Sequence, residues 1–170
     1  MQSQNDAESL FLVALAQLRS EYREQTFWVE RDVVCWLQRR ITSIPSADMT
    51  VFNDFGILPG PRRSFSADLA ILDREKVLLA AEFKFEPSSK RVDIKANKLP
   101  VIGWSDYLKD VERIQRFVEM GMTPVAWAVC VDEGARYVGK PRGSFTQVEN
   151  WDTGYQTQVT LTRWPTQGAP

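Results

Sequence analysis

The sequence predicts one α/β domain built on a mixed β-sheet. Segments with the apolar spacing of helices alternate with short apolar or alternating segments typical of strands, in the order helix, helix, three strands, helix, strand. At 170 residues the chain is long enough for one domain with a sizeable core. The domain is expected to span residues 1–170, with a core at 27–132, an N-terminal helix at 6–22 and a β-rich C-terminal extension at 135–165.

The first two expected elements are helices at residues 6–22 and 27–42. Both carry apolar residues at helical spacing. The stripe of the second helix comprises Val33, Val34, Leu37 and Ile41. When this stripe is extended toward the N-terminus it reaches Glu30, so we expect that carboxylate on the inward face, where it needs a partner.

Three strands are expected next, at residues 49–58, 65–73 and within 77–87. The second strand alternates, and Asp68 shares a face with Ala70. The third strand is almost continuously apolar, which favours a central position with both faces covered.

A helix at residues 104–120 and a strand at 123–134 complete the expected core. Weaker strand patterns follow at 144–150 and 156–163. The overall prediction is a central mixed sheet flanked by helices, with extra elements at both ends of the chain.

Composition limits the chemistry that this chain could perform. The 21 basic and 22 acidic residues nearly cancel, so any nucleic-acid contact must come from a local basic patch or from bound metal ions. The chain has no histidine, which excludes imidazole-based catalysis and His-ligated zinc. No long apolar run or signal-peptide pattern is present, and the two cysteines are expected as free thiols, so we expect a cytoplasmic protein.

Glu82 and Lys84 lie two residues apart near the end of the third strand, on one face. Burying two charges in an apolar strand is costly unless they pair or hold an ion. The short turn between the second and third strands places Asp68 opposite residues 80–82, within reach of Glu82. The helix at 27–42 is the expected cover for this face.

This group of acidic oxygens suggests a site for Mg²⁺ or Mn²⁺. Neighbouring carboxylates repel one another unless a hard divalent cation neutralises them, and such ions prefer oxygen ligands. Asp68, Glu82 and the backbone carbonyl of Phe83 are the expected ligands. Lys84 would orient or deprotonate the attacking water, or stabilise negative charge on a phosphate.

Three segments, "VERDVVCWL", "SADLAIL" and "AAEFKFEP", resemble the PD-(D/E)XK nuclease superfamily over about residues 27–132. The resemblance implies a restriction-endonuclease-like α-β-β-β-α-β core, Mg²⁺-dependent hydrolysis of DNA phosphodiesters, nucleic acid as the partner, and allows a homodimer. The matched positions are the helix glutamate, the motif aspartate and the E-x-K pair: Glu30, Asp68, Glu82 and Lys84. Ala67 stands where the motif has proline. Glu30 would support a ligand or a second metal.

Basic residues flank the expected site on both sides, as a rim that guides phosphate would. They are Arg62, Arg63, Lys90, Arg91, Lys95 and Lys98. An ordinary solvated surface is the alternative interpretation of the same residues.

Other interpretations of the motif remain open. Glu82 and Lys84 could form a simple salt-bridged strand end, and Asp93-Ile94-Lys95 has the same E-x-K shape in a polar segment. Asp110 and Arg113 are spaced for an intrahelical ion pair, or could belong to the site. The alternative function is a non-catalytic nucleic-acid-binding or protein-interaction module on the same fold.

Overall fold

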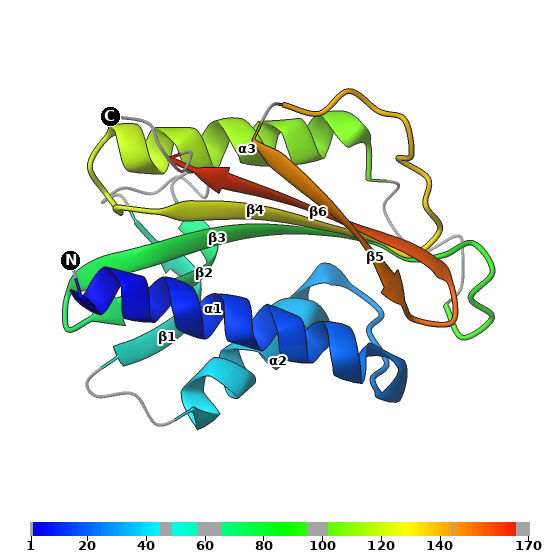
Figure 1. The fold of residues 1–170 in the computed structure, drawn as a ribbon, viewed down its shortest axis with the longest axis horizontal. Coiled ribbons are helices and arrows are strands. Elements are labelled where there is room, and N and C mark those ends of the chain that lie inside the picture. The colour runs from blue at the N-terminus through cyan, green and yellow to red at the C-terminus, as the bar shows by residue number, and fades with distance from the viewer. Residues whose placement is uncertain (1, 45–48, 58–65, 95–101, 144, 166–170) are drawn as a thin grey trace.

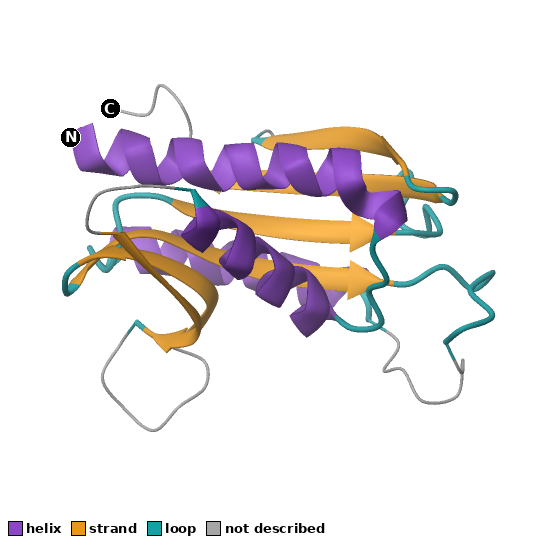
Figure 2. Ribbon diagram, turned by 90° about the horizontal axis from the view of Figure 1, so that it is seen from below, coloured by secondary structure: helices purple, strands orange, loops and turns teal. Residues whose placement is uncertain are grey.

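The computed structural model describes residues 2–44, 49–57, 66–94, 102–143 and 145–165. A six-stranded mixed sheet lies between two helices on one face and a third helix on the other (Figures 1 and 2). The elements are α1 (Gln2–Glu21), the 3₁₀ helix η1 (Tyr22–Glu24), α2 (Glu30–Ser43), β1 (Met49–Gly56), β2 (Ser66–Asp73), β3 (Lys76–Glu86), α3 (Trp104–Glu119), β4 (Ala126–Asp132), β5 (Thr146–Asp152) and β6 (Gln156–Trp164). The predicted α/β class and the mixed sheet flanked by helices are confirmed.

The strand order is β1-β2-β3-β4-β6-β5. β3 pairs in antiparallel fashion with β2 and in parallel with β4, and α3 makes the crossover between β3 and β4. β3 is therefore a central strand, as its continuous apolar character predicts. The C-terminal strands extend the same sheet, because β6 pairs with β4 and β5 lies outside β6.

The two faces of the sheet differ in side-chain size. α1 and α2 pack against the face that carries Leu69, Ile71 and Phe83. α3 packs its aromatic residues against a face made largely of alanine, including Ala70 and Ala80. The small alanine side chains leave room for the bulky residues of α3.

This arrangement corrects one prediction. Asp68, Glu82 and Lys84 follow the alternation of Ala70 and Ala80, so they point toward α3. The prediction that the helix at 27–42 covers their face is wrong, because the apolar stripe of α2 packs on the opposite, larger-residue face.

α2 also begins later than predicted, at Glu30. The Asp32 carboxylate accepts hydrogen bonds from the backbone N–H groups of Trp28 (2.8 Å) and Val29 (3.0 Å) and fixes the chain entering the helix. Glu30 is therefore in the first turn. From this end position its side chain reaches Lys84 although α2 lies on the other face.

Within the described residues, none of the helices combines the length and apolar character needed to cross a lipid bilayer.

Candidate functional site

β2 and β3 separate at the point where the candidate residues lie. Their ladder runs as far as Leu69 and Ala81, whereas β3 stays paired with β4 as far as Glu86. Beyond the last ladder pair, the Asp68 carboxylate accepts a hydrogen bond of 2.7 Å from the backbone N–H of Phe83. A side-chain oxygen is thus placed in the fork between the two strands.

Glu82 is the most deeply placed acidic group of this fork. It is fully buried, and its Oε2 lies 2.5 Å from Arg113 NH1 on α3. Its Oε1 has no hydrogen-bond partner. Burial, together with the negative charge of Asp68, raises the pKa of the Glu82 carboxyl well above its ordinary value.

Lys84 links three elements through its ammonium group. Its Nζ lies 2.8 Å from Asp110 Oδ2 and 3.3 Å from Glu30 Oε2, and donates a hydrogen bond of 2.8 Å to the Phe83 carbonyl. Burial disfavours the charged form, but the carboxylates of Glu30 and Asp110 outweigh it and raise the pKa of Lys84. In this conformation Lys84 is an ammonium ion at neutral pH, which favours an electrostatic role over one as a base.

Glu30 enters the site from the end of α2. Its side chain is 31% exposed. Burial is the main cause that raises the pKa of Glu30 to about 7, with a further contribution from the charge of Asp68, while Lys84 acts in the opposite direction. The Glu30 carboxyl therefore exchanges a proton in the neutral range.

Asp110 and Arg113 of α3 complete the group; the sequence left open whether they form an intrahelical pair or belong to the site, and they were not among the predicted site residues. The expected intrahelical contact is present at 3.6 Å, but both residues make shorter contacts with β3. Asp110 falls three residues after Tyr107 and four before Ile114, on the buried stripe of α3. The argument that placed Glu30 on an inward face would have found Asp110 too.

The resulting acidic cluster, defined as Glu30, Asp68, Glu82, Lys84, Asp110 and Arg113, contains more acidic than basic groups. Four carboxylates face two cations, which leaves two negative charges in excess when all groups are ionised. Burial raises the pKa of Asp68 and of Asp110 as well. The hydrogen bond from the Phe83 N–H and the two cations only partly offset burial at Asp68, and the two cations only partly offset it at Asp110.

The donors of the acidic cluster suit a hard divalent cation in chemistry, since they are carboxylate oxygens. Two buried ones, Glu82 Oε1 and Asp110 Oδ2, have no hydrogen-bond partner, although Asp110 Oδ2 lies 2.8 Å from Lys84 Nζ. In this structure the ammonium of Lys84 and the guanidinium of Arg113 pair with these carboxylates. In the part of the chain that the structure describes, no three acidic or cysteine side chains are arranged to hold a metal ion. The Phe83 carbonyl, an expected ligand, accepts from Lys84.

Only two of the six residues predicted to form the basic rim, Lys90 and Arg91, lie in the described part of the chain. Arg62, Arg63, Lys95 and Lys98 lie outside the described residues, and Lys90 is exposed. Arg91 is not on the surface: its side chain is 6% exposed and pairs with Glu133 (3.0 Å) and Asp93 (2.5 Å). This geometry speaks against Arg91 as a phosphate contact and gives Asp93, the acidic residue of the second E-x-K pattern, a structural partner.

Comparison of the chain with protein-family models, with curated proteins and with solved structures finds no match.

Proposed function

We propose that this chain is a metal-dependent nuclease that hydrolyses DNA phosphodiester bonds on a restriction-endonuclease-like fold. The surplus of buried carboxyl groups over cations in the acidic cluster carries this proposal. A structural ion-pair network needs no surplus of buried carboxylates, whereas a site for a divalent cation does. The unpartnered Oε1 of Glu82 supports the same interpretation.

The oxygens of Asp68 and Glu82, with the Phe83 carbonyl, would hold Mg²⁺ or Mn²⁺. The bound ion would supply charge neutralisation at the phosphate and lower the pKa of the attacking water. Because Asp68 and Glu82 come from adjacent strands that separate at this point, they would place the reaction at the opening of the sheet.

Lys84 and Glu30 would act on the reacting groups from the exposed side of the cluster. The Lys84 ammonium would donate to a non-bridging phosphate oxygen, where negative charge increases as water attacks phosphorus. Glu30, whose pKa is about 7, would accept the proton that the attacking water loses. The bond from phosphorus to the leaving sugar oxygen then breaks, and that oxygen takes up a proton from solvent.

A plasmid-nicking assay tests the proposal. Wild-type protein is expected to relax supercoiled DNA with Mg²⁺ and to stop when EDTA is added. Asp68→Asn and Lys84→Ala should each lower the rate by about 100-fold or more, since each removes charge from the reacting centre. Nicking at the wild-type rate by either variant would remove that residue from the mechanism.

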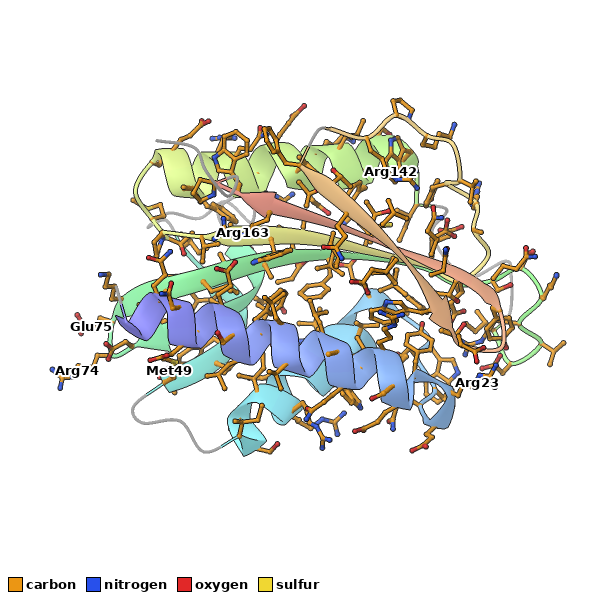
Figure 3. All side chains as sticks on the ribbon, viewed as in Figure 1. Arg23, Met49, Arg74, Glu75, Arg142 and Arg163 are labelled. Atoms are coloured by element: carbon orange, nitrogen blue, oxygen red, sulfur yellow. The ribbon has the colours of Figure 1, made fainter. Side chains whose placement is uncertain are left out.

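Glu75→Gln is the matched control for the loss of one charge. Glu75 lies in the turn before β3, at the end of the molecule where Figure 3 labels it beside Arg74. Nine residue steps along the strand separate it from Lys84, about 30 Å. Its charge is screened at that distance, so the control should cleave DNA like wild type.

One observation favours the alternative, a non-catalytic nucleic-acid-binding or protein-interaction module. Both cations of the acidic cluster already have carboxylate partners, at 2.5 Å for Arg113 and 2.8 Å for Lys84. Calorimetry distinguishes the two functions. Absence of Mg²⁺ and Mn²⁺ uptake, combined with unchanged DNA binding in Asp68→Asn, would favour the module.

A further inference from the structure

Arg113 connects the acidic cluster with solvent. Its NH1 lies 2.5 Å from Glu82 Oε2 and 3.6 Å from Asp110 Oδ1. The Arg113 side chain is 31% exposed, whereas the side chains of Glu82 and Asp110 are buried. The guanidinium therefore reaches from the surface of α3 to the most deeply buried carboxylate of the cluster.

The two cations of the cluster are held differently. Lys84 has three partners on three elements, Glu30 on α2, Asp110 on α3 and the carbonyl of Phe83 on β3. Arg113 has one short contact outside its own helix, with Glu82. A partly exposed group with one short contact exchanges that contact for water more easily than a group with three, so Arg113 is the cation that leaves first.

Arg113 contacts only one of the two carboxylate oxygens of Glu82. One oxygen receives the guanidinium, while Oε1 stays buried without a partner. A buried carboxylate oxygen without a partner is costly, and a divalent cation would compensate it more fully than one N–H group does. Arg113 and such a cation would compete for the same carboxylate.

We propose that Arg113 is a mobile counter-charge, which occupies Glu82 until a divalent cation binds and then contacts a non-bridging oxygen of the DNA phosphate. This inference rests on the proposed function, since the cation and the phosphate are those of the nuclease. A divalent ion beside Glu82 repels the guanidinium, and a phosphate at the mouth of the site attracts it. The planar fork of arginine suits the oxygens of a phosphate.

The exchange couples the two ligands. Release of Arg113 by the cation makes the guanidinium available to DNA, and DNA that holds the guanidinium leaves Glu82 free for the cation. Because coupling between binding sites is reciprocal, each ligand should raise the affinity for the other by the same factor.

Calorimetric titration of the full chain with Mn²⁺ tests the competition. Arg113→Gln should bind Mn²⁺ about tenfold more tightly than wild type, because a competing positive charge next to a ligand is removed. Lys109→Gln is the matched control on the same helix, since the Lys109 side chain is 67% exposed and its ammonium pairs with Asp106, which is not part of the acidic cluster. It should bind Mn²⁺ like wild type.

The outcomes separate this inference from the proposed function. Equal Mn²⁺ affinity in wild type and Arg113→Gln would overturn the counter-charge, while the nuclease proposal would stand. Absence of Mn²⁺ uptake in wild type, Arg113→Gln and Lys109→Gln alike would overturn both.

Arg113→Lys tests the phosphate contact without removing the charge that Glu82 needs for folding. It should bind Mn²⁺ like wild type, but bind a phosphorothioate-substituted DNA duplex in the presence of Mn²⁺ about tenfold more weakly, because lysine lacks the fork. Fluorescence anisotropy measures this affinity. If Arg113→Lys binds this DNA as tightly as wild type, the proposed contact of Arg113 with phosphate is wrong. This result does not depend on whether Arg113→Gln folds.

Discussion

Two buried glutamates at the same end of the sheet, Glu82 on β3 and Glu133 just after β4, have opposite surroundings. Glu133 is 1% exposed and accepts hydrogen bonds with both oxygens. The Tyr22 hydroxyl (2.9 Å) and Arg91 NH1 (3.0 Å) bind its Oε1, and the Ser88 N–H (3.0 Å) binds its Oε2. Glu82 has Arg113 on one oxygen and no partner on the other.

The contrast separates a carboxylate whose two oxygens both have protein partners from one that has a partner on a single oxygen. Glu133 joins η1, the loop after β3 and the end of β4, and both of its oxygens accept hydrogen bonds, with Arg91, which also pairs with Asp93, as the nearby cation. Glu82 shares two cations with three other carboxylates. Surroundings like those of Glu133 stabilise a fold better, so the unpartnered oxygen of Glu82 supports the proposal that a ligand from outside the chain completes this site.

The largest effect is expected when the same substitution is made at both glutamates. Glu133→Gln should lower the free energy of unfolding by about 3 kcal/mol, because it breaks a buried ion pair with Arg91, which keeps only its contact with Asp93, and turns an amide N–H toward other donors. Glu82→Gln should change it by about 1 kcal/mol or less, because it relieves repulsion and Arg113 is free to turn to water. Urea unfolding measures both. Equal losses would show that the two sites are alike.

The pH dependence of stability sharpens the contrast. A carboxyl whose folded-state pKa is raised binds more protons when folded than when unfolded, so stability falls as pH rises from its ordinary pKa to the raised one. For Glu30 that window runs from 4.5 to about 7. After allowance for solvent screening we expect a loss of about 1–2 kcal/mol across it.

Urea midpoints measured from pH 4.5 to 8 test this expectation. Glu30→Gln should remove the part of the decline that falls near pH 7, because the amide does not titrate, whereas Glu75→Gln should keep it. A wild-type stability that rises between pH 5 and 7, followed alike by Glu30→Gln, would contradict the raised pKa of Glu30.

The elements and the inward direction of their side chains were predictable from periodicity. The continuous apolar run of β3 marked it as central, and the alternation of β2 placed Asp68 on the face of Glu82, because both patterns are local consequences of strand geometry. Asp110 was predictable by the same means, from its place between Tyr107 and Ile114 on the stripe of α3.

The identity of the helix that packs over the site was not predictable from the local sequence pattern. Whether α2 or α3 lies over Asp68 depends on which face of the sheet each helix packs against, and helical spacing gives only the face of the helix that turns inward. The handedness of the β3–α3–β4 crossover and the alanine-rich face decide it, and both are properties of the assembled sheet. The contact of Arg113 with Glu82 follows from that packing.

Divalent cations should raise the stability of the protein through binding at Glu82 and not at Glu133. With Mn²⁺ at about 10 times its dissociation constant, the wild-type protein should gain about 1.4 kcal/mol of stability. Glu133→Gln should gain as much, starting from a lower stability, while Glu82→Gln and Asp68→Asn should gain almost nothing. Thermal unfolding with and without Mn²⁺ measures the gain. A full gain in Asp68→Asn would place the ion elsewhere.

The smallest effect is expected at an exposed pair on α3. Lys109 Nζ lies 2.9 Å from Asp106 Oδ1, closer than Lys84 lies to Glu30, but the Lys109 and Asp106 side chains are 67% and 39% exposed. Water solvates both charges in the folded and unfolded states, so Lys109→Gln should change stability by about 0.5 kcal/mol or less. A loss in urea unfolding as large as that of Glu133→Gln would mean that contact distance, rather than burial, sets the energy of these pairs. The contrast between Glu82 and Glu133 would then lose its physical basis, because it depends on the cost of leaving a charge unbalanced away from water.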